Sequence, residues 1–182
     1  VARRLRLAEL HSREGQTAAA IEQFKRVCDQ LWAAGAFQDY TRVAERLLYH
    51  DANIRDVQRD LASAYVRIGQ ARKAVAKLGS LLQATPEDVG CNEIFAYAMA
   101  QMGKEDKAAS IAIEIARRVR KDNPDLGKVI ALLEMVPTWD SAQDGEAKRL
   151  IGELRGRAGK PPSGPSPAAR QAAAASSSPA RA

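Results

Sequence analysis

The sequence is poor in the residues that most often carry chemistry. It has two histidines, two cysteines and only 5% aromatic residues in a chain of 182. Cys28 and Cys91 are far apart, whereas small disulfide-stapled domains pair several cysteines in a shorter chain. We therefore exclude a disulfide scaffold and expect both thiols to be buried as small hydrophobic groups.

Local motifs for catalysis or metal binding are missing as well. The sequence has no Cys-x-x-Cys pair, no glycine-rich phosphate loop and no His-Glu-x-x-His pattern. His11 falls at a position expected to line the core, and His50 ends an expected helix, where a partly charged imidazole suits the helix dipole. Neither has the further ligands that a metal site needs. We predict no catalytic residue, metal, cofactor or small-molecule substrate, and hence no enzyme.

Long apolar runs are absent too. No stretch of about 18 apolar residues occurs, which excludes a transmembrane helix. No apolar segment typical of a signal peptide follows Val1-Ala2-Arg3-Arg4. We expect a cytoplasmic protein, and the abundance of alanine and arginine is typical of GC-rich bacterial genomes.

Acidic residues disappear toward the end of the sequence. The formal net charge is +6, but five basic residues and no acidic residue follow Glu153, so residues 1–153 are nearly neutral. A nearly neutral body argues against a nucleic-acid-binding fold. Residues 157–182 are rich in Ala, Pro and Ser and lack large apolar side chains, which predicts a disordered basic tail. Its spread charges would support only weak contact with nucleic acid or an anionic membrane.

A repeat of 34 residues is present. Gly35, Gly69 and Gly103 are evenly spaced, and the segment 61–69 aligns with 95–103. This period is the length of one helix–turn–helix unit. Each glycine is expected to end a helix in the left-handed conformation, which other residues adopt only with strain.

The flanking residues fit the packing of two helices. Small Ala62 and Ala96 would let helices approach closely, while large residues such as Leu61, Tyr65, Phe95 and Met99 would fill the space beside them. A further glycine, Gly15, lies only 20 residues before Gly35. We interpret the helix over about 17–34 as one that is shared between an N-terminal hairpin and the next unit.

With this period and these positions, the sequence resembles the tetratricopeptide repeat (TPR) family over about residues 5–122. The unit 55–88 fits best and 89–122 fits well, whereas 21–54 departs from the pattern at Tyr40, Ala44 and Ala52. The resemblance implies an all-α, right-handed superhelical stack of antiparallel helix hairpins, a TPR-like α-solenoid. We place it in residues 1–156, with an N-terminal helix at 2–14 and capping helices within 125–156. The expected helices span about 2–14, 17–34, 37–50, 55–68, 71–84, 88–102, 105–121, 125–136 and 143–156.

The resemblance also implies a protein-binding scaffold or adaptor that holds a peptide or helix of a partner in a concave groove. The groove would be lined by the first helix of each unit. The carboxylate clamp of TPR co-chaperones is not expected, because only Lys25 matches its pattern. The partner-binding residues that we predict are Lys25, Arg26, Asp29, Trp32, Arg59, Ser63, Arg67, Glu93, Tyr97 and Gln101.

Other interpretations stay open at this stage. The groove residues could be an ordinary solvated helix face with ion pairs such as Glu22–Arg26. The stack could be a rigid spacer whose basic tail contacts nucleic acid or membrane, or it could form a homo-oligomer through the helix at 2–14. The basic cluster at 117–121 ends an expected helix, where cations offset exposed carbonyl groups, or it could meet an anionic partner.

Overall fold

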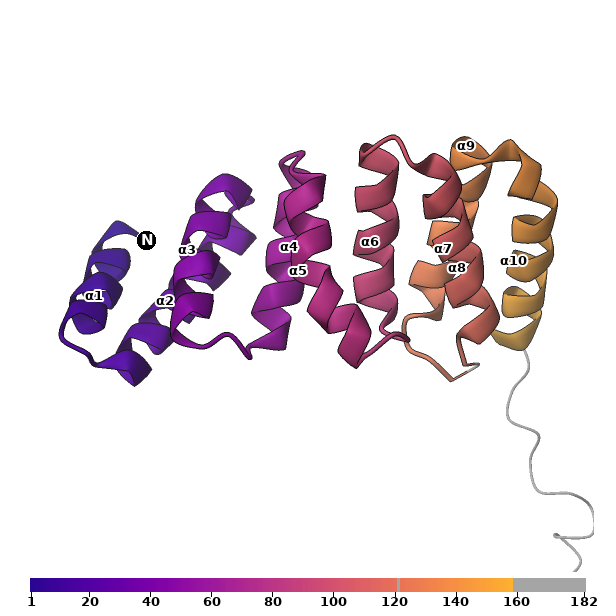
Figure 1. Cartoon of the computed structure of the whole chain (residues 1–182). Helices are drawn as coiled ribbons and strands as arrows, with labels where there is room; N and C mark the ends of the chain where they lie inside the picture. The colour runs from indigo at the N-terminus through magenta and orange to yellow at the C-terminus, as the bar shows by residue number, and fades with distance from the viewer. Residues whose placement is uncertain (121, 159–182) are drawn as a thin grey trace, which may run out of the picture.

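The computed structural model describes residues 1–120 and 122–158, and these residues form helices and no strand. Their order along the chain can be followed in Figure 1. The helices are α1 (Ala2–Arg13), α2 (Thr17–Ala33), α3 (Phe37–His50), α4 (Arg55–Arg67), α5 (Ala71–Ala84), α6 (Val89–Gln101), α7 (Glu105–Arg118), α8 (Leu126–Glu134), α9 (Val136–Trp139), the 3-10 turn η1 (Ser141–Gln143) and α10 (Asp144–Ala158).

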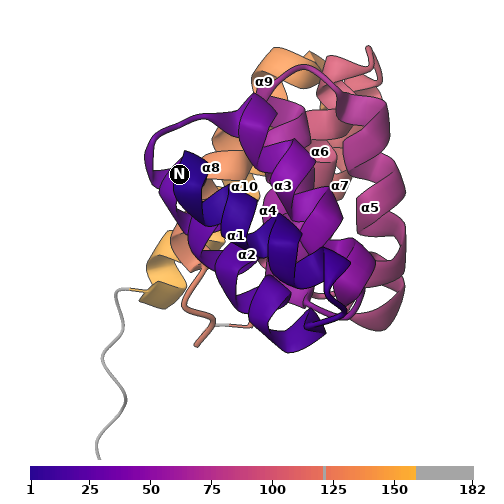
Figure 2. The same cartoon turned by 90° about the vertical axis from the view of Figure 1, so that its left-hand side faces the viewer.

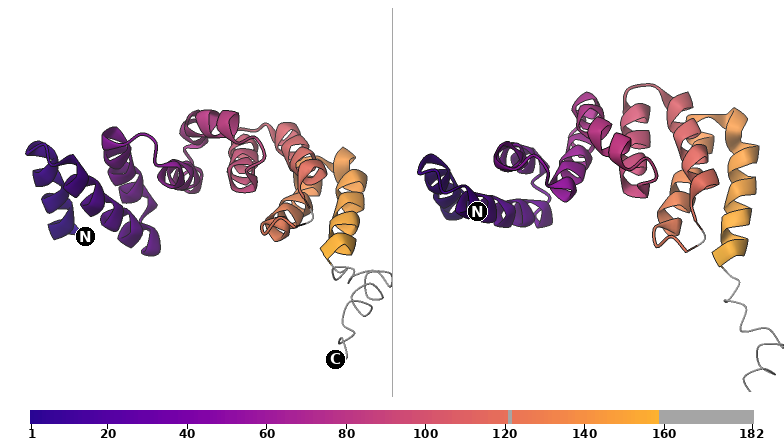
Figure 3. Two further views of the ribbon diagram at one scale, coloured as in Figure 1. Left: turned by 90° about the horizontal axis from the view of Figure 1, so that it is seen from below. Right: turned by 60° about the horizontal axis from the view of Figure 1, so that its bottom comes forward.

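The helices form a single elongated row. Each helix from α1 to α8 packs against the next one along the chain, and α2 contacts both α1 and α3, as the shared-helix interpretation requires. Seen from below, α2, α4, α6 and α8 lie along one side of the row and α3, α5 and α7 along the other (Figure 3). The view from the N-terminal end, with α1 and α2 in front, shows the same stacking (Figure 2). The fold is the predicted right-handed stack of antiparallel hairpins, closed at its C-terminal end by α8 to α10.

The four glycines of the repeat pattern make the turns between paired helices. Gly15, Gly35, Gly69 and Gly103 have φ between +66° and +74°, and no other described residue has a positive φ. At the α4–α5 turn, the N–H of Gln70 donates to the carbonyl of Tyr65 (2.8 Å) and that of Gly69 to Val66 (3.0 Å). This pair of bonds is the Schellman ending of a helix. The left-handed conformation predicted from the glycine spacing is therefore confirmed.

Two glycines of the same hairpin allow a matched test of this role. A Cβ added at Gly69 or at Gly79, inside α5, would meet no atom within 4 Å. Gly69→Ala is expected to lower the free energy of unfolding by about 1–2 kcal/mol through backbone strain alone. Gly79→Ala is expected to raise it by about 0.5–1 kcal/mol, because alanine is the better helix former. Urea denaturation measures both, and effects of the same sign would contradict the assignment.

The core consists of two clusters of buried side chains. The first extends from α1 to α6 and includes Phe24, Tyr65 and Cys28. The second joins α6 to α10 and includes Leu132 and Leu133. Both cysteines are buried and free, and burial raises the pKa of the Cys28 thiol to about 12 and that of Cys91 to about 11. Ala62 and Ala96 are fully buried, which fits their predicted role at close helix contacts.

Phe95 and Met99 are partly buried and pack against the two core clusters, which fits their expected place beside the small alanines. Several other local expectations were wrong. His11, expected to line the core, is only partly buried, and its Nδ1 contacts the side chain of Gln16. The segment left without a helix between the expected helices 125–136 and 143–156 contains the short helix α9 and the turn η1. Pro137 lies in the first turn of α9, where its missing N–H breaks no bond. The expected helix 105–121 ends at Arg118.

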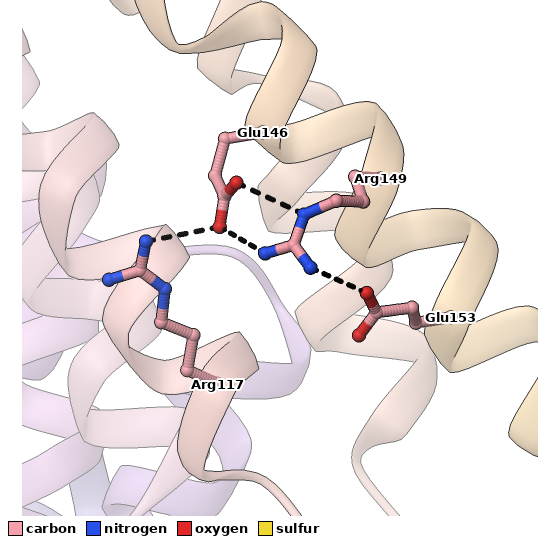
Figure 4. Close-up of polar contacts among 4 residues, drawn as sticks. All are labelled: Arg117, Glu146, Arg149 and Glu153. Atoms are coloured by element: carbon pink, nitrogen blue, oxygen red, sulfur yellow. Dashed lines mark hydrogen bonds and ion pairs between the residues drawn. The ribbon is translucent and has the colours of Figure 1, made fainter.

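Ion pairs fasten α10 to the stack. Glu146 of α10 accepts hydrogen bonds from Arg117 of α7 (3.0 Å) and from Arg149 (2.7 Å), and Arg149 also binds Glu153 (2.7 Å; Figure 4). The hydrogen bonds from Arg149 and Arg117 lower the pKa of Glu146 to about 2. Part of the basic cluster at 117–121 therefore has a structural role, since Arg117 holds α10 in place.

The structure describes the start of the expected tail and the helix of the expected oligomer surface. Helix α10 runs to Ala158, past the predicted start of the tail, and the rest of the tail (159–182) lies outside the described residues. At the other end, α1 leaves Leu7 and Leu10 exposed, with 41% and 51% of their surface accessible. Self-association through α1 stays a prediction.

Candidate functional site

All ten predicted partner-binding residues lie on α2, α4 and α6, on the side of the row that these helices share with α8 (Figure 3). We call this side the inner face. Its helices are neighbours: α4 contacts α6, and α6 contacts α8. The predicted residues do not form one site there, because they fall into three groups with different surroundings.

The first group is an arginine stacked on aromatic rings, which we call the Arg67 cluster. The guanidinium of Arg67 lies 4.9 Å from the ring centre of Phe37 and 5.8 Å from that of Trp32. Trp32 in turn makes edge contacts with Phe37 (5.3 Å) and with the buried Tyr40 (5.1 Å). No carboxylate of the described residues pairs with Arg67. Tryptophan and arginine held in this way are typical of the anchors of protein interfaces.

The second group lines a cleft between α4, α6 and α8, which we call the acidic cleft. Its volume is about 500 Å³. Three predicted residues, Arg59, Ser63 and Glu93, lie in its wall. The complete lining is Arg59, Asp60, Ser63, Glu87, Asp88, Val89, Gly90, Glu93, Ile94, Asn123, Pro124, Asp125 and Lys128. Five carboxylates therefore face two cations.

Both cations of the acidic cleft already form ion pairs, Lys128 within the wall and Arg59 with one carboxylate of the wall and with Asp56 beside it. Arg59 lies 3.3 Å from Asp56 and 3.9 Å from Asp60, and Lys128 lies 2.9 Å from Asp125. The side chain of Asp88 accepts a hydrogen bond (2.8 Å) from the backbone N–H of Cys91 and so caps α6. This arrangement leaves the cleft with carboxylates that its own cations do not neutralise.

Asp60 and Glu93 show this imbalance most clearly. Burial raises the pKa of both carboxyl groups, and the nearby cations, Arg59 for Asp60 and Lys128 for Glu93, offset the effect only in part. Neighbouring carboxylates, such as Asp125 beside Glu93, raise it further. Among the residues that the structure describes, no cation lies within ion-pair distance (4 Å) of Glu93.

The remaining predicted residues contribute less to a free surface. Tyr97 packs its ring against Trp139 of α9 (5.7 Å), and Gln101 donates to the backbone carbonyl of Val66 (2.9 Å). These two side chains join neighbouring elements of the stack. Lys25, Arg26 and Asp29 are exposed on α2, where Arg26 forms an ion pair with Glu22 at 2.7 Å.

Sequence reasoning missed the contribution of α8 and of the two loops at the same end. Asp125 and Lys128 complete the acidic cleft, together with Glu87 and Asp88, which directly precede α6. Asp125 and Lys128 were assigned to the capping helices, and Glu87 and Asp88 to the end of the unit 55–88. The alternation of inner and outer helices could have placed α8 on the inner face, since it follows the outer helix α7.

The contact between Ser12 and His50 lacks the third group of a catalytic triad within the described residues. Ser12 and His50 are in hydrogen-bond contact (Oγ to Nε2, 3.0 Å), but the imidazole stacks on Phe24 and no described carboxylate bonds to its other nitrogen. A serine nucleophile normally needs such an orienting group. In the described part of the chain, no three His, Cys, Asp or Glu side chains are placed to hold a metal ion. No helix within residues 1–120 and 122–158 is long and apolar enough to cross a membrane.

Comparison with solved structures places the fold among TPR-like helical stacks. The chain is similar to a structure titled MamA RS-1 ArsTM double mutant, with a TM-score of 0.66, 16% identity and 86% of each chain covered. MamA 41-end from Desulfovibrio magneticus RS-1 gives a TM-score of 0.61 and 14% identity, with 85% of this chain and 94% of that chain covered.

A third similar structure is a co-chaperone. The Hsp90 co-chaperone Cns1 from Saccharomyces cerevisiae gives a TM-score of 0.57 and 17% identity over 78% of this chain, which spans 46% of Cns1. No protein-family model matches the sequence, and no curated protein matches it. At these identities the likeness concerns the fold.

Proposed function

We propose that the chain belongs to the TPR family and works as a non-enzymatic scaffold that binds a peptide or helix of a partner protein on its inner face. The Arg67 cluster carries this proposal. An arginine without a carboxylate partner lies over two aromatic rings, at the junction of α2 and α4. The co-chaperone named in the comparisons is consistent with a role in protein–protein contact.

Site-specific photo-crosslinking tests which side of the stack meets the partner. A photoreactive amino acid replaces the inner residues Lys25 and Ser63 in two variants, and the outer residues Arg72 (α5) and Lys107 (α7) in two control variants. We expect adducts with a partner protein only from the inner positions. Equal yields from inner and outer positions would contradict the proposal.

Arg67→Ala then tests the anchor itself. We expect the partner identified by crosslinking to bind about tenfold more weakly, because truncating an interface anchor removes more than about 1 kcal/mol. Arg72→Ala removes the same charge from the outer helix α5 and is the matched control. Calorimetric titration measures both, and an equal loss in the two variants would assign the effect to net charge instead of to the cluster.

A further inference from the structure

The acidic cleft indicates which kind of partner segment the inner face binds. This inference rests on the proposed scaffold function. The cleft lies on the inner face, at the end of α4 opposite the Arg67 cluster: Arg59 and Arg67 are eight residues apart on one helix, which is about 12 Å along its axis. The inner face therefore presents an arginine–aromatic surface at one end and a surplus of carboxylates at the other.

The surplus is spread along the cleft instead of being focused on one point. Its carboxylates come from α4, from α6 and the two residues before it, and from Asp125, which directly precedes α8. No group of three among the described residues can converge on a metal ion. An extended ligand with several separate positive groups suits this spacing better than a single small cation does.

The walls between the carboxylates suit the stems of long cationic side chains. Ile94 and Pro124 supply apolar surface, and Lys and Arg bury their methylene groups against such surface while their charged ends reach polar partners. Gly90 adds no side chain to this wall, and a Cβ there would only make ordinary contacts with Arg59 Cδ (3.6 Å) and Asp88 Oδ1 (3.4 Å). The cleft wall formed by α4, α6 and α8 thus combines apolar surface with a net negative charge.

We propose that the acidic cleft binds a positively charged segment of the partner protein, whose Lys or Arg side chains pair with Asp60, Glu87 and Glu93. The commitment to a cationic peptide comes from charge complementarity: the lining has five carboxylates and only two cations, and both cations already form ion pairs. The chain's own basic residues after Glu153, among them Lys160, Arg170 and Arg181, are the competing occupant.

Fluorescence anisotropy with the full chain and three labelled peptides tests this proposal. The peptides share length and apolar residues and carry either lysine, glutamine or glutamate at the same four positions. We expect the lysine peptide to bind tightest and its affinity to fall as salt is raised, because the contacts are partly exposed. The double variant Asp60→Asn, Glu93→Gln keeps the shape of both side chains, and it should weaken the lysine peptide by about fivefold per carboxylate.

Two further variants separate the alternatives. Glu14→Gln with Glu105→Gln removes the same charge from exposed sites outside the acidic cleft, and it should leave the affinity unchanged. In the second, Lys160, Arg170 and Arg181 are replaced by Gln in the full chain. If this variant binds the lysine peptide many times more tightly than the unmodified chain, the occupant is the chain's own segment and the proposal is wrong.

The remaining outcomes are equally distinct. Peptides of all three charges bound alike, with no effect of Asp60→Asn and Glu93→Gln, would overturn the cationic specification and leave the proposed scaffold function standing. The conclusion would be the same if a partner protein crosslinks to the inner positions while the chain binds the three peptides with equal affinity. The absence of both peptide binding and inner crosslinks would overturn the scaffold function as well.

Discussion

Replacing Phe24 by alanine is expected to lower the free energy of unfolding by about 3–5 kcal/mol. The Phe24 ring is 1% exposed and stacks on His50 of α3 at 5.8 Å. It belongs to α2, the helix that packs against both α1 and α3. The cavity left by removing the ring would therefore weaken the α1–α2 and α2–α3 interfaces together. Such a loss is a large share of the stability of a small domain.

Urea denaturation followed by circular dichroism measures this loss. The control is Leu10→Ala on the neighbouring α1, whose side chain is 51% exposed, and it should change the stability by less than about 0.5 kcal/mol. Hydrogen exchange of Phe24→Ala should show the fastest gain of exchange in α1, which has no helix on its other side within the described chain. A loss below about 1 kcal/mol would contradict the shared role of α2.

Replacing Leu133 by alanine is expected to lower the free energy of unfolding by about 2–5 kcal/mol. This side chain is fully buried on α8, in the second core cluster, which joins α6 and α7 to α8, α9 and α10. In a stack whose units touch only their neighbours, damage stays near its origin. Hydrogen exchange should therefore quicken in α7 to α10 and stay close to the unmodified rate in α1 to α3.

The conservative variant Leu133→Met is the matched control and should cost less than about 1.5 kcal/mol, because it keeps the side-chain volume. Phe24→Ala and Leu133→Ala should also combine additively within about 0.5 kcal/mol, since the two residues lie in separate clusters. A uniform rise of exchange along the whole chain would show that the stack unfolds as one unit, and the local response predicted here would be wrong.

The helices could be predicted closely because their signals are local. A left-handed glycine such as Gly69 ends a helix within its own six residues, through bonds to Tyr65 and Val66. The apolar positions between the glycines follow the helical period. Prediction failed where the local signal has two meanings: Pro137 can end a helix or begin one, and here it begins α9.

The candidate site was predicted less completely for a different reason. Helical spacing placed Arg59, Arg67 and Tyr97 on the inner side of their helices, yet it could not say what each side chain meets. Arg67 lies on aromatic rings of α2 and α3, Tyr97 packs against Trp139, and Arg59 faces an acidic cleft that α8 completes. The aromatic partners of Arg67 and Tyr97 are 30 or more residues away along the chain, and α8 begins 67 residues after Arg59.

The sequence by itself thus determined the repeat, the helix ends at the four glycines and the small residues that let the helices approach, because each depends on contacts within one turn or one hairpin. Only the tertiary structure decided that α8 continues the inner face, that Gln101 and Tyr97 join neighbouring elements and that five carboxylates gather around Arg59 and Lys128. The physical reason is that side-chain partners across a stack depend on how successive hairpins rotate against one another. That rotation results from all of the packing contacts together.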